Sequence, residues 1–235
     1  MTQTISSPIV YYPKSISELL SLYKTMPDSQ LFAGGTEILS TKTTKYPVFS
    51  QNIICLSKID ELSAIRRSEG YIEIGACATL NKIIGIGEHV LKTALYKALN
   101  SIATKELRNL ATIGGNICSP DRRKNLIPLL ILLDTKLELR KQGTSRWLNL
   151  KRFLSESEGM AKDEILTKLR IPFNNYNHQF FTITGDLKFN YNDALSFTAL
   201  ASTQKDIITS IKFSAGYGNK KVFRSRDFEE SLSGR

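Results

Sequence analysis

Two short glycine-containing motifs constrain this chain more than any other feature. LFAGGTEI covers Leu31 to Ile38, and ATIGGNI covers Ala111 to Ile117, about 80 residues further on. Each has an apolar run with strand propensity, then two glycines, then a hydroxyl or amide side chain. Paired glycines lack a Cβ and can adopt φ > 0, so a turn there brings main-chain N–H groups close to a ligand. The pair predicts two walls of one extended phosphate-bearing ligand site, while a single Gly-Gly after a strand is also typical of a tight turn.

Length and charge indicate a folded protein with an acidic ligand or partner. The chain has 235 residues, of which 41% are apolar, enough to bury a substantial core. Its 32 Lys and Arg against 22 Asp and Glu give a net charge of +10, which favours an anionic cofactor, an acidic subunit or nucleic acid. A solvated basic surface is the alternative. Nucleic-acid binding is disfavoured because basic and aromatic residues do not interleave.

Metal, disulfide and acid–base chemistry are not indicated. Cys55, Cys77 and Cys118 are far apart and show no C-x-x-C spacing, and His89 and His178 stand in unrelated contexts. The N-terminus lacks a signal-peptide pattern, and no apolar run approaches the roughly 18 residues of a membrane span. We therefore expect a cytoplasmic protein without a membrane segment.

The hydrophobic periodicity predicts a series of helices and strands along the chain. A helix begins with the capping box of Ser15 and Glu18 and ends near Pro27. The further elements are strands 31–33 and 52–56, a hairpin of 61–67 and 71–76, helices 80–86 and 89–102, and a strand before the second Gly-Gly loop. They are followed by helix 126–134, a hairpin of 135–140 and 145–150, helix 151–156, strands 165–171, 179–184, 194–203 and 207–216, and a helix from 227.

Four segments carry a family resemblance. LFAGGTEI, RNLATIGGNI, the apolar helix LIPLLILLD and the strand ILTKLRIP, in this order, resemble the FAD-binding medium subunit or domain of molybdenum hydroxylases. This family includes xanthine dehydrogenase and carbon monoxide dehydrogenase, and the resemblance runs from Tyr12 to the end of the chain. It implies an α+β fold with a PCMH-type FAD-binding domain, 1–174. This domain would be made of two α/β subdomains, 1–56 and 57–174, with the cofactor between them. A small α+β C-terminal domain, 175–235, is expected to be shortened relative to the family.

The resemblance also implies which residues bind the cofactor. Main-chain amides of both motifs would hold the FAD pyrophosphate, with the side chains of Thr36 and Asn116 as polar contacts. Ile102 and Leu166 would line the cofactor, although both also fit the hydrophobic core. The full expected set is Leu31, Phe32, Ala33, Gly34, Gly35, Thr36, Glu37, Ile38, Ile102, Thr112, Ile113, Gly114, Gly115, Asn116, Asn125 and Leu166.

The sequence departs from the family pattern at three places. Asn125 stands where relatives carry an aspartate, and the position of a lysine near the flavin is taken by Gly185, with Lys188 as a displaced candidate. The loop CSPDRRKN is charged where relatives have a neutral stretch. Asn125, the missing lysine and the shortened C-terminal domain leave open a degenerate structural or assembly subunit that has lost FAD.

The resemblance implies an electron-transfer flavoprotein. FAD would receive electrons from [2Fe-2S] clusters in a small partner subunit and pass them to NAD+ or another acceptor. The molybdenum cofactor would lie in a large partner subunit, where hydroxylation occurs. A cluster in this chain is not expected, since it lacks a cysteine array.

Overall fold

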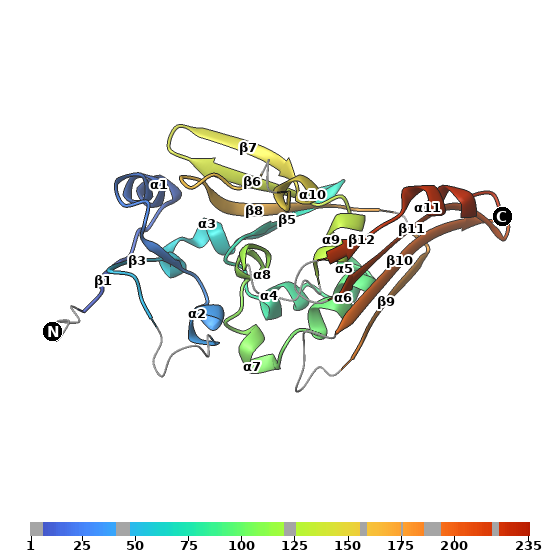
Figure 1. The fold of residues 1–235 in the computed structure, drawn as a ribbon, viewed down its shortest axis with the longest axis horizontal. Coiled ribbons are helices and arrows are strands. Elements are labelled where there is room, and N and C mark those ends of the chain that lie inside the picture. Colours follow the sequence, from blue (N-terminus) through green and yellow to red (C-terminus); the bar gives the residue numbers. More distant parts are fainter. Residues whose placement is uncertain are drawn as a thin grey trace.

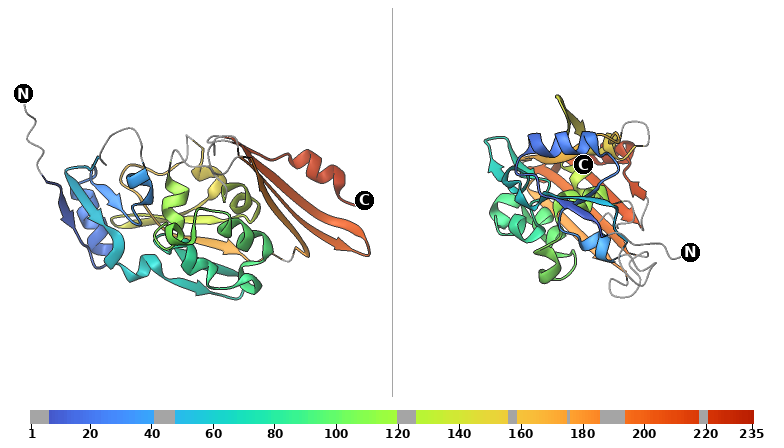
Figure 2. Two further views of the ribbon diagram at one scale, coloured as in Figure 1. Left: turned by 90° about the horizontal axis from the view of Figure 1, so that it is seen from below. Right: turned by 90° about the vertical axis from the view of Figure 1, so that its left-hand side faces the viewer.

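The computed structural model describes residues 7–40, 48–119, 126–155, 159–174, 176–185, 194–217 and 221–235. These residues form three β-sheets with helices between and beside them, which confirms the α+β class (Figure 1). Strand β1 lies at one end of the molecule and the C-terminal sheet and helix lie at the other (Figure 2). The three sheets fall within the ranges 1–56, 57–174 and 175–235, but the domain boundaries themselves stay a prediction.

The first sheet is parallel and small. Its order is β1-β3-β2, formed by β1 (Ile9–Tyr11), β2 (Gln30–Phe32) and β3 (Asn52–Cys55), with helix α1 (Ile16–Thr25) connecting β1 to β2. The predicted capping box is confirmed: the Ser15 hydroxyl accepts from the Glu18 N–H (3.1 Å), and the Glu18 carboxylate accepts from the Lys14 N–H (2.8 Å). Leu19 of α1 and Ile54 of β3 are buried in one hydrophobic core cluster, which also includes Leu62. Strand β1 was not predicted.

The second sheet is antiparallel throughout, in the order β4-β5-β8-β6-β7. Its strands are β4 (Ile65–Arg67), β5 (Tyr71–Gly75), β6 (Lys136–Lys141), β7 (Thr144–Asn149) and β8 (Ile165–Pro172). The hairpin predicted from residue 61 is wrong over its first residues, which form helix α3 (Asp60–Ser63) after the 3-10 turn η1 (Leu56–Lys58). The reason is spacing: Ile59 and Leu62 are three residues apart and both are buried.

In the described residues, seven short helices lie along the chain between strands β5 and β8. They are α4 (Leu80–Ile84), α5 (Glu88–Leu91), α6 (Thr93–Asn100), α7 (Lys105–Arg108), α8 (Ile113–Cys118), α9 (Ile127–Leu132) and α10 (Leu150–Phe153). The single helix predicted over 89–102 is wrong, because Lys92 adopts φ 67° and divides it into α5 and α6. Apolar residues keep helical spacing across this break, so their pattern could not reveal it.

The strand predicted before the second Gly-Gly motif is also wrong. Only Thr112 forms an isolated bridge, with Thr79, and Ile113 begins helix α8. Thr112 is the N-cap residue, since its hydroxyl accepts from the Gly115 N–H at 3.1 Å. The β-branched pair Thr-Ile suggested a strand, but here the threonine starts a helix.

The C-terminal sheet has the order β12-β11-β10-β9 and is antiparallel. Its strands are β9 (His178–Thr184), β10 (Leu195–Gln204), β11 (Ile207–Tyr217) and β12 (Lys221–Phe223), followed by helix α11 (Arg226–Leu232). Phe181 and Leu200 join the same core cluster as α6, α9 and the second sheet. The last strands and the final helix are therefore confirmed, apart from β12, which was not predicted.

Candidate functional site

The two glycine motifs meet at one cleft of ≈ 330 Å³. The end of β2 and the short helix α2 (Thr36–Ser40) form one wall, and helix α8 with the residues around it forms the other. This confirms that the fold brings the two distant motifs together. The lining residues are Gln30, Leu31, Ala33, Gly34, Gly35, Thr36, Glu37, Ile38, Ala111, Thr112, Gly115, Asn116, Cys118 and Ser119.

The first motif offers free main-chain donors. Within the described part of the chain, the N–H groups of Gly34, Gly35 and Thr36 have no hydrogen-bond partner. Gly35 has φ +68°, and a Cβ added there would lie 2.4 Å from the Phe32 ring, so only glycine fits this turn. Three consecutive unpartnered amides therefore belong to residues that line the cleft, and such an array favours an anion.

The two walls touch through Gly34. A Cβ added to Gly34 would lie 1.8 Å from the Leu110 carbonyl oxygen and 3.4 Å from the Ala111 nitrogen. The absence of a side chain thus lets the main chain of the first wall pack against the main chain that leads into α8. This contact fixes the width of the cleft.

Most N–H groups of the second motif are already hydrogen-bonded, so its expected use of main-chain amides stays a prediction. Thr112 is the exception, since its N–H has no hydrogen-bond partner among the described residues. The N–H groups of Ile113 and Gly114 donate to the carbonyls of Ala78 (3.1 Å) and Ala76 (2.8 Å). The Gly115 N–H donates to the Thr112 hydroxyl, and the Asn116 N–H donates to the Thr112 carbonyl. The loop expected from the sequence is a helix, and its first amides are satisfied by the N-cap residue and by the segment before α4.

Side chains of the second wall supply polar atoms instead. Asn116 and Ser119 are each 8% exposed, and neither the Asn116 Oδ1 nor the Ser119 Oγ has a hydrogen-bond partner among the described residues. Both line the cleft opposite the first motif. Buried polar atoms without partners are costly, so they indicate a ligand that supplies the missing hydrogen bonds. Sequence reasoning included Asn116 but missed Ser119, whose burial arises only in the folded chain.

Five of the expected site residues do not line the cleft. Phe32 lies beneath Gly35, and Gly114 packs on Ala76. Ile113, Ile102 and Leu166 belong to the hydrophobic core cluster, the alternative already considered for the last two. Asn125 lies outside the described residues, as do Lys188 and most of the charged loop.

The thiol of Cys118, at the end of α8, also lies at the cleft. Cys118 lines it, and Cys55, Cys77 and Cys118 are all free. Burial raises the pKa of Cys77 to about 12, so this thiol stays protonated at neutral pH.

Among the described residues there is no group of three histidine, cysteine or acidic side chains that could hold a metal ion. In the same residues, no helix has the length and apolar character required to cross a membrane.

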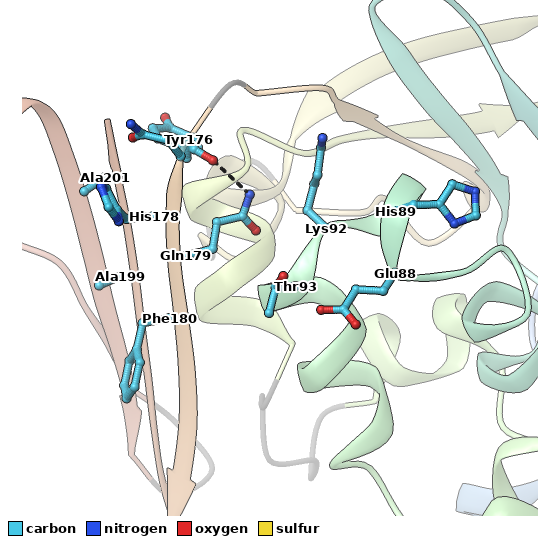
Figure 3. A pocket seen from close by; sticks show the side chains of 11 residues that line it. Glu88, His89, Lys92, Thr93, Tyr176, His178, Gln179, Phe180, Ala199 and Ala201 are labelled. Carbon is cyan, nitrogen blue, oxygen red and sulfur yellow. Dashed lines mark hydrogen bonds between the residues drawn. The ribbon is translucent and has the colours of Figure 1, made fainter. Parts of the chain in front are cut away.

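A larger groove of ≈ 680 Å³ lies between β9 and the start of α6 (Figure 3). It contains both histidines, which the sequence placed in unrelated contexts. The His89 ring is turned away from β9, while His178 shares a 2.9 Å hydrogen bond with the Thr203 hydroxyl. Glu88 and Lys92 give this groove opposite charges and it lacks both glycine motifs. The smaller cleft is therefore the candidate cofactor site despite its size.

Known proteins give an independent assignment. The family described as the FAD binding domain in molybdopterin dehydrogenase matches residues 3–174. The nicotinate dehydrogenase FAD-subunit of Eubacterium barkeri is 31% identical over 173 residues, 68% of this chain and 57% of that protein. The xanthine dehydrogenase FAD-binding subunit of Escherichia coli O157:H7 is 27% identical over 79% of this chain and 64% of its own length. This chain thus spans less than two thirds of these relatives.

Solved structures share the fold. Quinoline 2-oxidoreductase from Pseudomonas putida 86 matches with a TM-score of 0.86 at 21% identity, over 98% of this chain and 81% of that chain. Carbon monoxide dehydrogenase from Hydrogenophaga pseudoflava matches with a TM-score of 0.82 at 22% identity, over the same shares. The matched family and the shared fold lead to one assignment: this chain belongs to the FAD-binding domain family of the molybdopterin dehydrogenases.

Proposed function

We propose that this chain binds FAD in the cleft between the two glycine motifs and acts as the electron-transfer flavoprotein of a molybdenum hydroxylase. The observation that carries this proposal is the pairing of free amides at Gly34, Gly35 and Thr36 with the unpartnered Asn116 and Ser119 across the cleft. The amides suit the negative diphosphate of FAD, and the side chains suit its hydroxyl and carbonyl groups.

The residues of the cleft divide the task of binding. The first motif would hold the diphosphate through its N–H groups, and the Thr36 hydroxyl would add a donor. Asn116 and Ser119 would orient the adjoining part of the cofactor from the opposite wall. The bound flavin would accept and release electrons, while the protein supplies its position and surroundings. Contacts from Ile102, Asn125 and Leu166 stay predictions.

The electron path requires partner chains. We propose that a small subunit with [2Fe-2S] clusters delivers electrons, that a large subunit holds the molybdenum cofactor, and that NAD+ or another acceptor receives the electrons. Three cysteines are too few to bind a cluster with four thiolates. The net charge of +10 favours docking of an acidic partner, and an association insensitive to salt would argue against this.

A degenerate subunit that has lost FAD is the second candidate. Asn125 replaces the family's aspartate, and the expected lysine position is occupied by Gly185. The free amides and the buried, unpartnered Asn116 favour the flavoprotein instead, because a structural scaffold gains nothing from leaving them unsatisfied.

Titration of the purified chain with FAD, FMN and riboflavin tests the proposal. FAD should bind more tightly than the other two, because only FAD carries the diphosphate that the first motif holds. Quenching of flavin fluorescence measures each affinity. Equal affinities would show that the amides do not hold a diphosphate, and absence of FAD binding would favour the degenerate subunit.

A further inference from the structure

A polar cluster around Arg108 lies directly before the second wall of the cleft. The Arg108 guanidinium donates to the carbonyls of Asn100 (3.1 Å), Ile102 (2.8 Å) and Ala103 (2.7 Å). Its Nε donates to the Asn81 Oδ1 at 3.2 Å. One half-buried side chain therefore ties the segment 100–103 and helix α4 to helix α7.

Asn81 extends the same cluster. Its Nδ2 donates to the Lys105 carbonyl (2.8 Å) and to the Asn109 Oδ1 (2.7 Å). Asn81 thus uses both atoms of its amide, accepting from Arg108 and donating to the two ends of α7. A connected network of this kind holds a segment in one position better than its separate bonds would.

The cluster connects to the cleft through the main chain. Helix α7 ends at Arg108, and two residues later the Leu110 carbonyl meets Gly34 of the first motif. The Leu80 N–H donates to the Ala111 carbonyl at 2.9 Å, so the start of α4 holds this segment as well. A shift of α7 relative to α4 would move Leu110 against Gly34 and change the width of the cleft.

We infer that Arg108 is a positioning residue for the cofactor cleft, acting through Asn81 and the carbonyls of 100–103. The inference rests on the proposed function, since the affected ligand is FAD. Arg108 does not line the cleft, and its role is to keep the wall around Leu110 at the spacing that presents both Gly34 and Asn116 to one ligand.

Three variants at the cluster test this role. Arg108→Met should weaken FAD binding about ten-fold, as expected when a supporting residue displaces a binding group slightly. Arg108→Lys should recover part of the affinity, since an ammonium reaches some of the carbonyls but not Asn81 as well. Asn81→Ala should resemble Arg108→Met, and the double variant should be little worse than either, because residues of one network are not additive.

Arg224→Met provides the matched control. Arg224 forms a bidentate pair with Glu229 (2.9 and 3.0 Å) in the C-terminal part, so its loss also breaks a half-buried arginine network. Affinity for FAD is measured by fluorescence quenching well below each variant's melting temperature. An unchanged affinity in folded Arg108→Met and Asn81→Ala, or an equal loss in Arg224→Met, overturns the inference. Failure of the unaltered chain to bind FAD instead overturns the proposed function.

Discussion

Gly115→Ala should separate cofactor binding from stability. Gly115 is exposed at the cleft, where an added methyl group would occupy part of the ≈ 330 Å³. The nearest atom to that Cβ is the Thr112 Oγ1, at 3.0 Å, so a hydroxyl must shift by a few tenths of an ångström. The change therefore leaves the core packing intact and alters the surface that meets the ligand.

Gly115→Ala should change the free energy of unfolding only slightly but should lower the affinity for FAD strongly. Replacing glycine by alanine in a helix gains about 0.8–1.0 kcal/mol. Disturbing the Thr112 cap costs a comparable amount, about 0.5–2 kcal/mol. The free energy of unfolding should thus change by no more than about 1 kcal/mol. A methyl group forced into a close contact with FAD costs about 1–3 kcal/mol, which is roughly a five- to 150-fold loss of affinity.

Urea denaturation without FAD measures the first quantity, and fluorescence titration with FAD measures the second. The reasoning is refuted if the variant binds FAD as tightly as the unaltered chain. It is equally refuted if the variant loses several kcal/mol of stability, because Gly115 would then serve the core rather than the cleft.

Gly34→Ala should lower the free energy of unfolding by more than about 2 kcal/mol, because the added Cβ would lie 1.8 Å from the Leu110 carbonyl oxygen. Urea denaturation measures this loss, and Gly70→Ala is the control, because a Cβ there would have nothing within 4 Å. A hydrogen bond from Arg146 lowers the pKa of Glu164, so the stability from this pair is present above the unfolded pKa of about 4.3 and is lost as pH falls. Glu164→Gln should therefore be less stable than the unaltered chain at pH 7 and lose less on acidification, and thermal melts across pH that run parallel would contradict this. Cys77 should resist alkylation by iodoacetamide at pH 8, since desolvation raises its pKa to about 12, and rapid labelling of this half-buried thiol detected by mass spectrometry would contradict the raised pKa.

The sequence predicted those elements whose local pattern agrees with their tertiary role. Pro128 near the start of an apolar run correctly indicated helix α9, and the hairpin predicted from 135–140 and 145–150 is confirmed as β6 and β7. Ser15 and Glu18 predicted their own cap, because capping depends on neighbours in the chain. Such signals need no knowledge of distant contacts.

The errors occur where a distant contact decides the local structure. Thr112 starts a helix rather than ending a strand because the preceding segment pairs with residues 78–80, which the sequence does not reveal. The break at Lys92 lies within an uninterrupted apolar spacing. Strand β1 has only three residues and is recognisable only beside β3.

The candidate site was predictable in outline but not in chemistry. The glycine pairs correctly predicted that the two motifs form the walls of one cleft. Gly34 allows the close approach of the two main chains, and Gly35 adopts φ +68°. The division between free amides on one wall and side chains on the other depends on hydrogen bonds across the fold. Ser119 was missed for the same reason, because its burial and lack of a partner arise only when α8 packs against the first motif.

Amide chemical shifts of a ¹⁵N-glycine-labelled chain, recorded with and without FAD, test the central claim most directly. If the first motif holds the diphosphate, the N–H signals of Gly34 and Gly35 should shift strongly with FAD and also with ADP, which carries the same diphosphate. The Gly114 signal should change little, because its N–H already donates to the Ala76 carbonyl. Strong shifts at Gly114 with unchanged Gly34 and Gly35 would contradict the account, because the diphosphate would then be held by the second motif.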